Sequence, residues 1–206
     1  MPYLVRERLF IGNIGDAFEV LQGSSGSQIT HILSVLSSAS ISFFGEWRRG
    51  VEIPTKEIKK VYVGEDCSKD GGPKSALAPN NLLYALEYAG KDLRFVRMAV
   101  PLRDMERENL LDYLDVCLDF IAESRKIGSV LVHCFAGVSR SAAIITAYLM
   151  KMESLSLEGL TTFLIPLHLS LFRVCLVWGN FGGKKNLGES GFPNGIHLIF
   201  LCLVRG

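Results

Sequence analysis

The chain has 206 residues, of which 49% are hydrophobic and 21% are charged, with a formal net charge of +1 at pH 7. This length suits one domain with a buried core and is too short for two domains of ordinary size. The near-neutral charge excludes the basic surplus expected of a nucleic-acid-binding protein. Five cysteines without Cys-x-x-Cys spacing predict neither a disulfide framework nor a zinc site. With no signal peptide recognisable in the first ten residues, we expect a cytoplasmic or nuclear location.

Strand-like and helix-like segments alternate over the first two thirds of the chain. Apolar, β-rich runs predict strands, whereas an apolar repeat of about 3.6 residues predicts a helix. The predicted strands are 8–12, 30–35, 94–102 and 129–134. The predicted helices are 16–22, one that follows the cap Asn109 and presents Leu110, Leu114, Cys117, Leu118 and Ile121, and 142–150. This alternation predicts a three-layer α/β sandwich in which helices flank a mainly parallel central sheet.

Two regions depart from this pattern. Residues 64–81 are rich in Gly, Pro, Ser, Asp and Asn and show no apolar period, so we expect them to form a loop. The charge balance changes near Leu160, because residues 1–160 have a net charge of −2 whereas residues 161–206 contain one acidic residue and have a net charge of +3. The sequence therefore predicts one domain over residues 1–160 and an atypical apolar tail over residues 161–206.

The most informative point is the join between the predicted strand 129–134 and the helix that follows it. Here Cys134 and Arg140 are separated by Phe135, Ala136, Gly137, Val138 and Ser139. A strand-to-helix turn can direct backbone N–H groups into a concave anion site, and the helix N-terminus adds positive potential. Glycine in the middle lets the backbone turn tightly and approach a ligand. The spacing therefore predicts a phosphate-binding loop over residues 135–140.

Cys134 and Arg140 are the candidate catalytic pair in this loop. Electropositive surroundings can lower a thiol pKa by several units from about 8.5, so Cys134 would attack phosphorus as a thiolate. The planar fork of Arg140 can hold two phosphate oxygens. The attack would form a cysteinyl-phosphate, which water then hydrolyses without a metal or other cofactor. Ser141 can donate its hydroxyl to the leaving sulfur, and we expect His133 to orient the loop rather than to carry a proton.

The leaving oxygen of the phosphate ester needs a proton, which predicts a carboxylic acid near the cysteine. Asp104 is the candidate, because it follows the predicted strand 94–102 and a parallel neighbour would place it at the same sheet edge as Cys134. Glu106, Glu108 and Asp112 are competitors, and each is more typical of a solvated charge at a helix start.

Residues 130–150, VLVHCFAGVSRSAAIITAYLM, closely resemble the signature of dual-specificity protein phosphatases, within the larger protein tyrosine phosphatase group. The segments RLFIGNIGDA, THILSV and VPLRDMERENLLDYLDVCLDFI also resemble parts of that family. The resemblance implies that Cys134 is the nucleophile, Arg140 the phosphate binder, Ser141 the thiolate helper and Asp104 the acid. It also implies phosphorylated proteins as substrates, with mitogen-activated protein kinases as one expectation that the sequence itself does not test.

Departures from the family pattern concern the regions around this core. No long N-terminal kinase-docking region is recognisable, which favours a small, stand-alone type of family member. The segment between residues 30–35 and Asp104 is longer than usual, and it could serve as a lid, a docking site or filler. The Lys-Asn-Arg-Tyr-like segment of the tyrosine-only enzymes is not recognisable, which favours dual specificity. A related phosphatase acting on phosphoinositides or RNA is the rival enzyme, for which we would expect a more basic catalytic loop.

The tail replaces the helical pair with which the family normally closes its domain, so we expect those C-terminal helices to be missing. A membrane anchor at 159–178 is disfavoured because Pro166, His168 and Arg173 lie within it and a charged residue costs about 2.5 kcal/mol or more in a bilayer core. Our hypothesis is that the tail is out of register with the gene's usual product, for example through a retained intron or a mis-joined gene model, which sequencing of the transcript across the codons for Glu158 to Thr162 would test. An inactive or phosphopeptide-binding fragment is therefore the alternative to an active enzyme.

Overall fold

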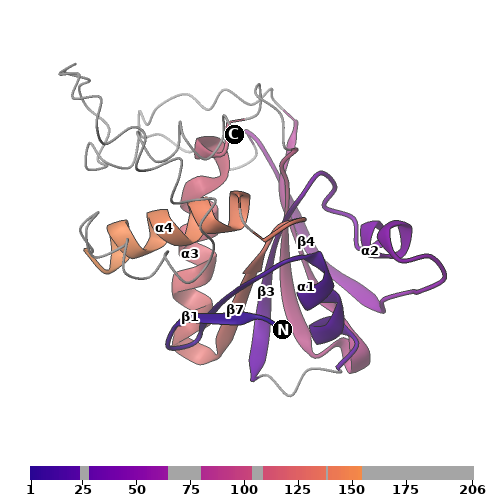
Figure 1. The fold of residues 1–206 in the computed structure, drawn as a ribbon. Helices are drawn as coiled ribbons and strands as arrows, with labels where there is room; N and C mark the ends of the chain where they lie inside the picture. Colours follow the sequence, from indigo (N-terminus) through magenta and orange to yellow (C-terminus); the bar gives the residue numbers. More distant parts are fainter. Residues whose placement is uncertain (24–27, 65–79, 104–108, 138, 155–206) are drawn as a thin grey trace.

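A mixed β-sheet with seven strands forms the centre of the described part of the chain (Figure 1). This computed structural model describes residues 1–23, 28–64, 80–103, 109–137 and 139–154. The strand order across the sheet is β1-β2-β7-β3-β6-β5-β4. In chain order the elements are β1 Tyr3–Arg6, β2 Leu9–Gly12, α1 Ile14–Leu21, β3 Ile29–Leu36, α2 Ser42–Trp47, β4 Thr55–Tyr62, β5 Leu82–Ala89, the 3-10 helix η1 Lys91–Leu93, β6 Phe95–Pro101, α3 Leu111–Ile127, β7 Ser129–His133 and α4 Arg140–Met152.

The four central strands β2, β7, β3 and β6 are parallel, whereas the outer strands β1, β5 and β4 pair antiparallel. In the register of the central strands, His133 of β7 lies opposite Gly12 of β2 and Ser34 of β3. Ser34 in turn lies opposite Ala99 of β6. Because parallel strands end at the same edge, the segments that follow β2, β6 and β7 meet at one edge of the sheet.

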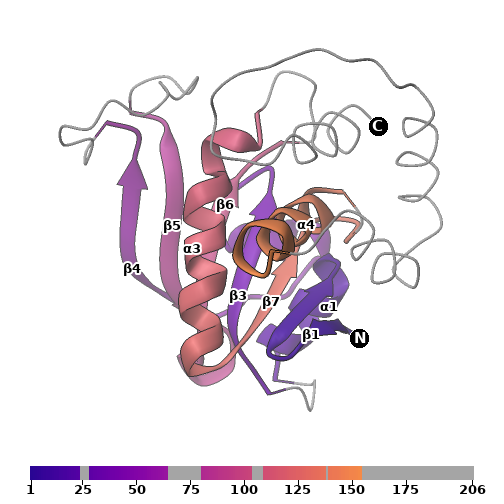
Figure 2. The same cartoon turned by 90° about the vertical axis from the view of Figure 1, so that its left-hand side faces the viewer.

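Helices cover both faces of this sheet, which makes three layers (Figures 1 and 2). Helices α3 and α4 pack on one face, and α1 and α2 pack on the other. Strand β7 illustrates the division, because Val130 and Val132 belong to the core beneath α3 and α4 whereas Leu131 belongs to the core beneath α1 and α2. Alternating side chains of a strand point to opposite faces, so a strand covered on both sides is apolar throughout. The predicted three-layer α/β sandwich is confirmed.

The two helices next to the segment between Cys134 and Arg140 lie where the sequence predicts them. Helix α3 begins at Leu111, and its N-cap residue is Leu110 rather than the expected Asn109. The side-chain oxygen of Asn109 still accepts a hydrogen bond from the backbone N–H of Leu111 over 3.2 Å, which satisfies one free donor of the first turn. Helix α4 is buried on every side from Arg140 to Met150, as its continuous apolar sequence indicated. Both helices therefore contribute to the larger of the two cores.

Strands β4 and β5 are the main elements that the sequence analysis missed. Strand β4 is an exposed edge whose sequence, TKEIKKVY, has no apolar alternation, because neither of its faces is deeply covered. Strand β5, LLYALEYA, is rich in Leu and Ala, which do not favour a strand by propensity. These two strands widen the sheet beyond β6, so part of the unusually long segment before Asp104 extends the sheet. Residues 65–79 of the predicted loop lie outside the described residues.

The tail and its alternatives also lie outside the described part of the chain, which ends at residue 154. This applies to the predicted anchor at 159–178 and to the missing C-terminal helices. Within the ranges that the structure describes, no helix is both long and apolar enough to span a bilayer.

Candidate active site

Cys134 lies directly after β7, at the sheet edge where the parallel strands end. Its side chain is 1% exposed. The backbone N–H of Gly137 donates to the sulfur over 3.2 Å, and the hydroxyl of Ser141 lies 3.3 Å from it. The loop from β7 to α4 thus folds back over the thiol and directs hydrogen-bond donors at it, an arrangement that favours a negative charge on sulfur.

The pKa of Cys134 lies below its ordinary value as a result of opposing effects. Burial is the largest of them, and it raises the pKa because it disfavours the thiolate. Hydrogen bonds from the side chain and backbone of Ser141 and from the backbone of Ser139, together with the positive charge of Arg140, lower it and prevail. The loop therefore favours a thiolate in a buried place, where an unassisted thiol would stay protonated, as burial alone makes Cys117 do.

Gly137 occupies a position that other residues would strain. Its backbone has a φ of +80°, in the left-handed region that favours glycine. A Cβ atom at this position would meet the carbonyl oxygen of Gly12 at 2.9 Å and the backbone nitrogen of Asn13 at 3.0 Å. The loop thus rests against the turn between β2 and α1, and the backbone N–H of Ile14 donates to the carbonyl of Phe135 over 3.2 Å. This packing holds the loop from the side opposite α4.

Arg140 opens helix α4 and is 8% exposed. Its Nη1 donates to the carbonyl oxygen of Leu102 over 2.6 Å. Leu102 follows β6 and is separated from Asp104 by one residue. The guanidinium therefore connects the loop after β7 with the backbone that leads into the predicted acid segment. Asp104 itself, with its competitors Glu106 and Glu108, lies outside the described residues, whereas Asp112 lies in the first turn of α3.

The remaining residues of the predicted loop differ in exposure. Phe135 is 47% exposed, Ala136 is also exposed, and Ser139 is half-buried. Val138 lies outside the described residues. Phe135 and Ala136 thus give this part of the rim an apolar, uncharged surface. In the described ranges, no cluster of His, Cys, Asp and Glu side chains is arranged to hold a metal ion.

His133 is fully buried beneath the loop, where its ring contacts two polar partners. Nε2 lies 2.7 Å from the hydroxyl of Ser34, and Nδ1 lies 3.4 Å from the carbonyl oxygen of Cys134. Burial, followed by the positive charges of Arg97 and Arg140, lowers the pKa of His133 to about 3, against a smaller opposite effect of the bond to Cys134. A neutral imidazole suits the structural role predicted from the sequence.

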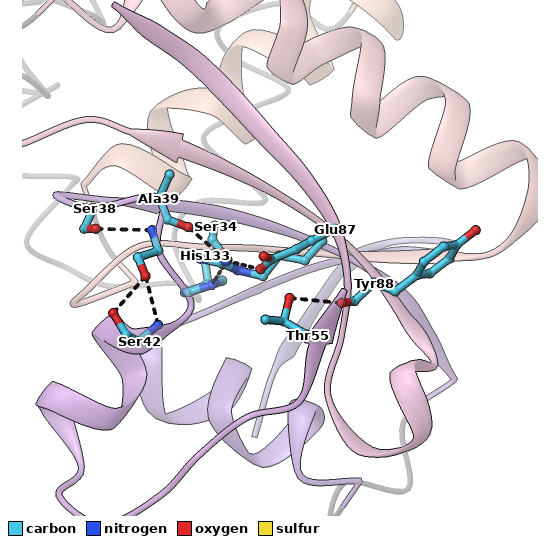
Figure 3. Close-up of polar contacts among 10 residues, drawn as sticks. Ser34, Ser38, Ala39, Ser42, Thr55, Glu87, Tyr88 and His133 are labelled. Atoms are coloured by element: carbon cyan, nitrogen blue, oxygen red, sulfur yellow. Dashed lines mark hydrogen bonds and ion pairs between the residues drawn. The ribbon is translucent and has the colours of Figure 1, made fainter. Parts of the chain in front are cut away.

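Behind His133 lies a buried polar group that the sequence analysis missed (Figure 3). Nε of Arg97 donates to the hydroxyl of Ser34 over 2.8 Å. Nη1 of the same guanidinium contacts Oε1 of Glu87 at 2.5 Å and the carbonyl of Ala39 at 3.1 Å. The one available signal was Arg97 itself, a charged residue in the middle of the apolar strand run RFVRMAVPL. Its partners, which come from β3, the segment after β3 and the missed strand β5, had no recognisable pattern.

Comparisons with known proteins show what the chain is similar to. Residues 73–168 match the family model described as "Dual specificity phosphatase, catalytic domain". Over 114 residues the chain is 36% identical to dual specificity protein phosphatase 16 of Homo sapiens, which covers 51% of this chain and 16% of that protein. Over 116 residues it is 39% identical to dual specificity protein phosphatase 1 of Arabidopsis thaliana, covering 53% of this chain and 57% of that protein.

The matched part therefore spans less than two thirds of either relative's length. Among solved structures, the chain is similar to the crystal structure of DUSP15, with 24% identity and a TM-score of 0.47. That likeness covers 79% of this chain and 74% of the other.

Proposed function

We propose that this chain, which belongs to the dual specificity phosphatase family through residues 73–168, hydrolyses phosphate esters on proteins by nucleophilic attack of Cys134. The observation that carries the proposal is the environment of its sulfur. A buried thiol receives one hydrogen bond from the backbone N–H of Gly137 and has the Ser141 hydroxyl 3.3 Å away. A buried cysteine that only fills space in the core does not require hydrogen-bond donors around its sulfur, because a thiol packs there as a small apolar group.

The reaction that this geometry supports proceeds in two steps. The Cys134 thiolate attacks phosphorus, the bond between phosphorus and the ester oxygen breaks, and a cysteinyl-phosphate forms. Arg140 holds two of the phosphoryl oxygens, and Asp104 protonates the departing oxygen. Water then attacks the phosphorus and gives a proton to the Asp104 carboxylate, the bond between sulfur and phosphorus breaks, and the thiolate leaves with its charge stabilised by the hydroxyl of Ser141. Inorganic phosphate and the unchanged enzyme result.

Phosphorylated proteins are the substrate class that we propose, with both phosphotyrosine and phosphoserine or phosphothreonine accepted. Dual specificity is supported by the family match of residues 73–168. The exposed, uncharged Phe135 and Ala136 at the loop rim favour a peptide over a more highly charged phosphoinositide or RNA. Mitogen-activated protein kinases are candidate substrates within this class. We also propose a reducing compartment, the cytoplasm or nucleus, in which a low-pKa thiol stays active.

The test is hydrolysis of a small aryl phosphate by the purified full chain. Cys134→Ser is expected to abolish turnover and to leave binding of a phosphotyrosine peptide intact, because the oxygen nucleophile is a poor substitute while the loop is unchanged. Cys117→Ala is the matched control, since this buried cysteine of α3 lies in the core and burial raises its pKa, which keeps the thiol protonated. We expect the control to retain activity. Folded parent protein that shows no turnover would refute the proposed activity.

A further inference from the structure

Arg97 is a fully buried charge at the centre of the sheet, and it lies next to the residues that support the catalytic loop. Strand β6 carries it, its exposure is 0%, and burial is the largest influence on its pKa, which is lowered. Glu87 from the neighbouring strand β5 pairs with it, and its guanidinium carbon lies 5.6 Å from the centre of the Phe44 ring. Burying such a pair costs free energy of desolvation that an apolar pair would avoid. Because the pair lies directly behind His133, Arg97 can contribute to the structure of the catalytic loop, besides any contribution to stability.

The donors and acceptors in this group fix where each proton lies. An arginine can only donate, so the hydroxyl oxygen of Ser34 accepts the hydrogen bond from Nε of Arg97. Ser34 is 1% exposed, and its other hydrogen-bond partner among the described residues is Nε2 of His133. The hydroxyl proton therefore points at that nitrogen, because a buried donor is almost always satisfied. Nε2 then accepts, which leaves the proton of the neutral imidazole on Nδ1.

We propose that Arg97 is a positioning residue that acts through Ser34 to hold His133 as the Nδ1–H tautomer. In this tautomer the ring donates to the carbonyl oxygen of Cys134, 3.4 Å away. The orientation of the imidazole depends only on the described contacts. Its consequence for catalysis rests on the proposed phosphatase function, in which Cys134 is the nucleophile.

The consequence for the thiolate follows from the direction of the Cys134 carbonyl. A donor on that oxygen neutralises part of the carbonyl's negative end close to the sulfur, and it fixes the peptide from which the loop turns. In the opposite tautomer, the lone pair of Nδ1 would face the lone pairs of the carbonyl oxygen, and the peptide would rotate away. Rotation of this peptide would move the sulfur out of line with the backbone N–H of Gly137. The distance between that nitrogen and the sulfur is 3.2 Å in the structure. The thiolate would then be less stable.

The charged groups around the His133 ring come from three elements. Arg97 of β6 and Arg140 of α4 disfavour a positive imidazole, and burial does so most strongly. Glu87 of β5 is directed at Arg97 and not at the ring, because its carboxylate bonds the far side of the guanidinium. The ion pair with Glu87 thus fixes the position of Arg97. Arg97 in turn orients the hydroxyl of Ser34, which donates its proton to Nε2 of His133.

Ser34→Ala is the most direct test, because it removes the transmitting hydroxyl and leaves the ion pair in place. Two readouts are needed, neither of which requires turnover. The first is the tautomer of His133 by ¹⁵N NMR of the full chain. The second is the pH midpoint for alkylation of Cys134 by iodoacetamide, followed by mass spectrometry of the peptide that contains it. We expect the Nδ1–H form in the parent, its loss in Ser34→Ala, and an upward shift of the midpoint by about half a unit to one unit.

Four further variants sharpen the result. Ser34→Thr retains a hydroxyl and should return the midpoint towards that of the parent. Arg97→Met combined with Glu87→Met replaces the ion pair by apolar side chains and should shift the midpoint as Ser34→Ala does, and joining all three changes should add nothing further, because they act on one path. Ser124→Ala, at a buried serine of α3, is the matched control and should leave the midpoint unchanged.

The proposal would be overturned by a parent His133 that carries its proton on Nε2. It would equally be overturned if Ser34→Ala lowered the unfolding temperature but left the Cys134 midpoint unchanged, since that is the behaviour of a merely structural contact. Should the double variant fail to fold, Ser34→Ala still decides the question. Hydrolysis of an aryl phosphate by the parent is measured separately, so the loss of the proposed function and the loss of the positioning role give different results.

Discussion

Gly137→Ala perturbs the loop between Cys134 and Arg140 at a residue whose backbone conformation and close packing both require glycine. The φ of +80° costs a residue with a side chain about 1–2 kcal/mol. The new Cβ would also lie 2.9–3.0 Å from backbone atoms of Gly12 and Asn13, which cannot rotate away as a flexible side chain could. Overpacking of this kind costs roughly 1–3 kcal/mol. We therefore expect the free energy of unfolding to fall by about 2–5 kcal/mol.

The same change should raise the pKa of Cys134. Relief of the contact moves the Gly137 backbone, whose N–H lies 3.2 Å from the sulfur. A hydrogen bond to a charged group contributes about 1.5–3 kcal/mol, which corresponds to roughly one to two pKa units. At a pH below the thiol pKa, the thiolate fraction and hence the alkylation rate should fall roughly 10- to 100-fold.

Urea unfolding and the pH dependence of Cys134 alkylation measure the two effects. Gly50→Ala is a matched control, because Gly50 also has a φ of +80° but a Cβ there would meet nothing within 4 Å. It should cost only the conformational part, about 1–2 kcal/mol, and leave the alkylation profile unchanged. If Gly137→Ala and Gly50→Ala had the same effect on both measurements, the reasoning about close packing and donor alignment would be refuted.

Two other predictions concern protons at and near the site. Because burial and neighbouring positive charges lower the pKa of His133 to about 3, an NMR titration should show no protonation of its ring between pH 5 and 8. In the unfolded chain His133 binds a proton near pH 6.5. Protonation therefore favours the unfolded state, and the free energy of unfolding should fall by up to about 1.4 kcal/mol per pH unit as the pH falls from 6.5 towards 3. A titration midpoint near 6.5 for His133 in the folded protein would contradict this assignment. Asp104→Asn should lower kcat for a phosphoserine peptide about 10²- to 10⁴-fold, because the leaving oxygen would lose its proton donor. Asp112→Asn, which changes the competing carboxylate in α3, should alter kcat little. A larger loss of kcat in Asp112→Asn than in Asp104→Asn would instead assign the acid to α3.

Most of the elements around the site could be predicted from local patterns in the sequence. Strands β2, β3, β6 and β7 are apolar runs because helices cover both faces of the sheet, and helices α3 and α4 carry the apolar pattern of that cover. Strand β4 could not be predicted in this way, because it lies at an exposed edge where no burial imposes a pattern on the sequence. Its position depends on pairing with β5, which is a contact between segments distant in sequence.

The polar group behind the loop illustrates the same limit. Arg97 could be noticed as a charge within an apolar strand, but the sequence does not say which residue pairs with it. Glu87 and Ser34 become its partners because β5 and β3 lie on either side of β6 in the sheet. The sequence predicts that His133 orients the loop, whereas only the tertiary structure shows that Ser34 and Arg97 lie next to it.

The sequence of the join between Cys134 and Arg140 was by itself sufficient to predict a phosphate-binding loop, because the spacing, the glycine and the following apolar helix are local requirements of that turn. The contacts around the Cys134 thiol could not be predicted in this way. Gly137 rests against the turn after β2, and Arg140 binds the backbone after β6, because parallel pairing brings those strand ends to one edge. These contacts join residues far apart in the chain, so only the packing of the whole sheet could determine them.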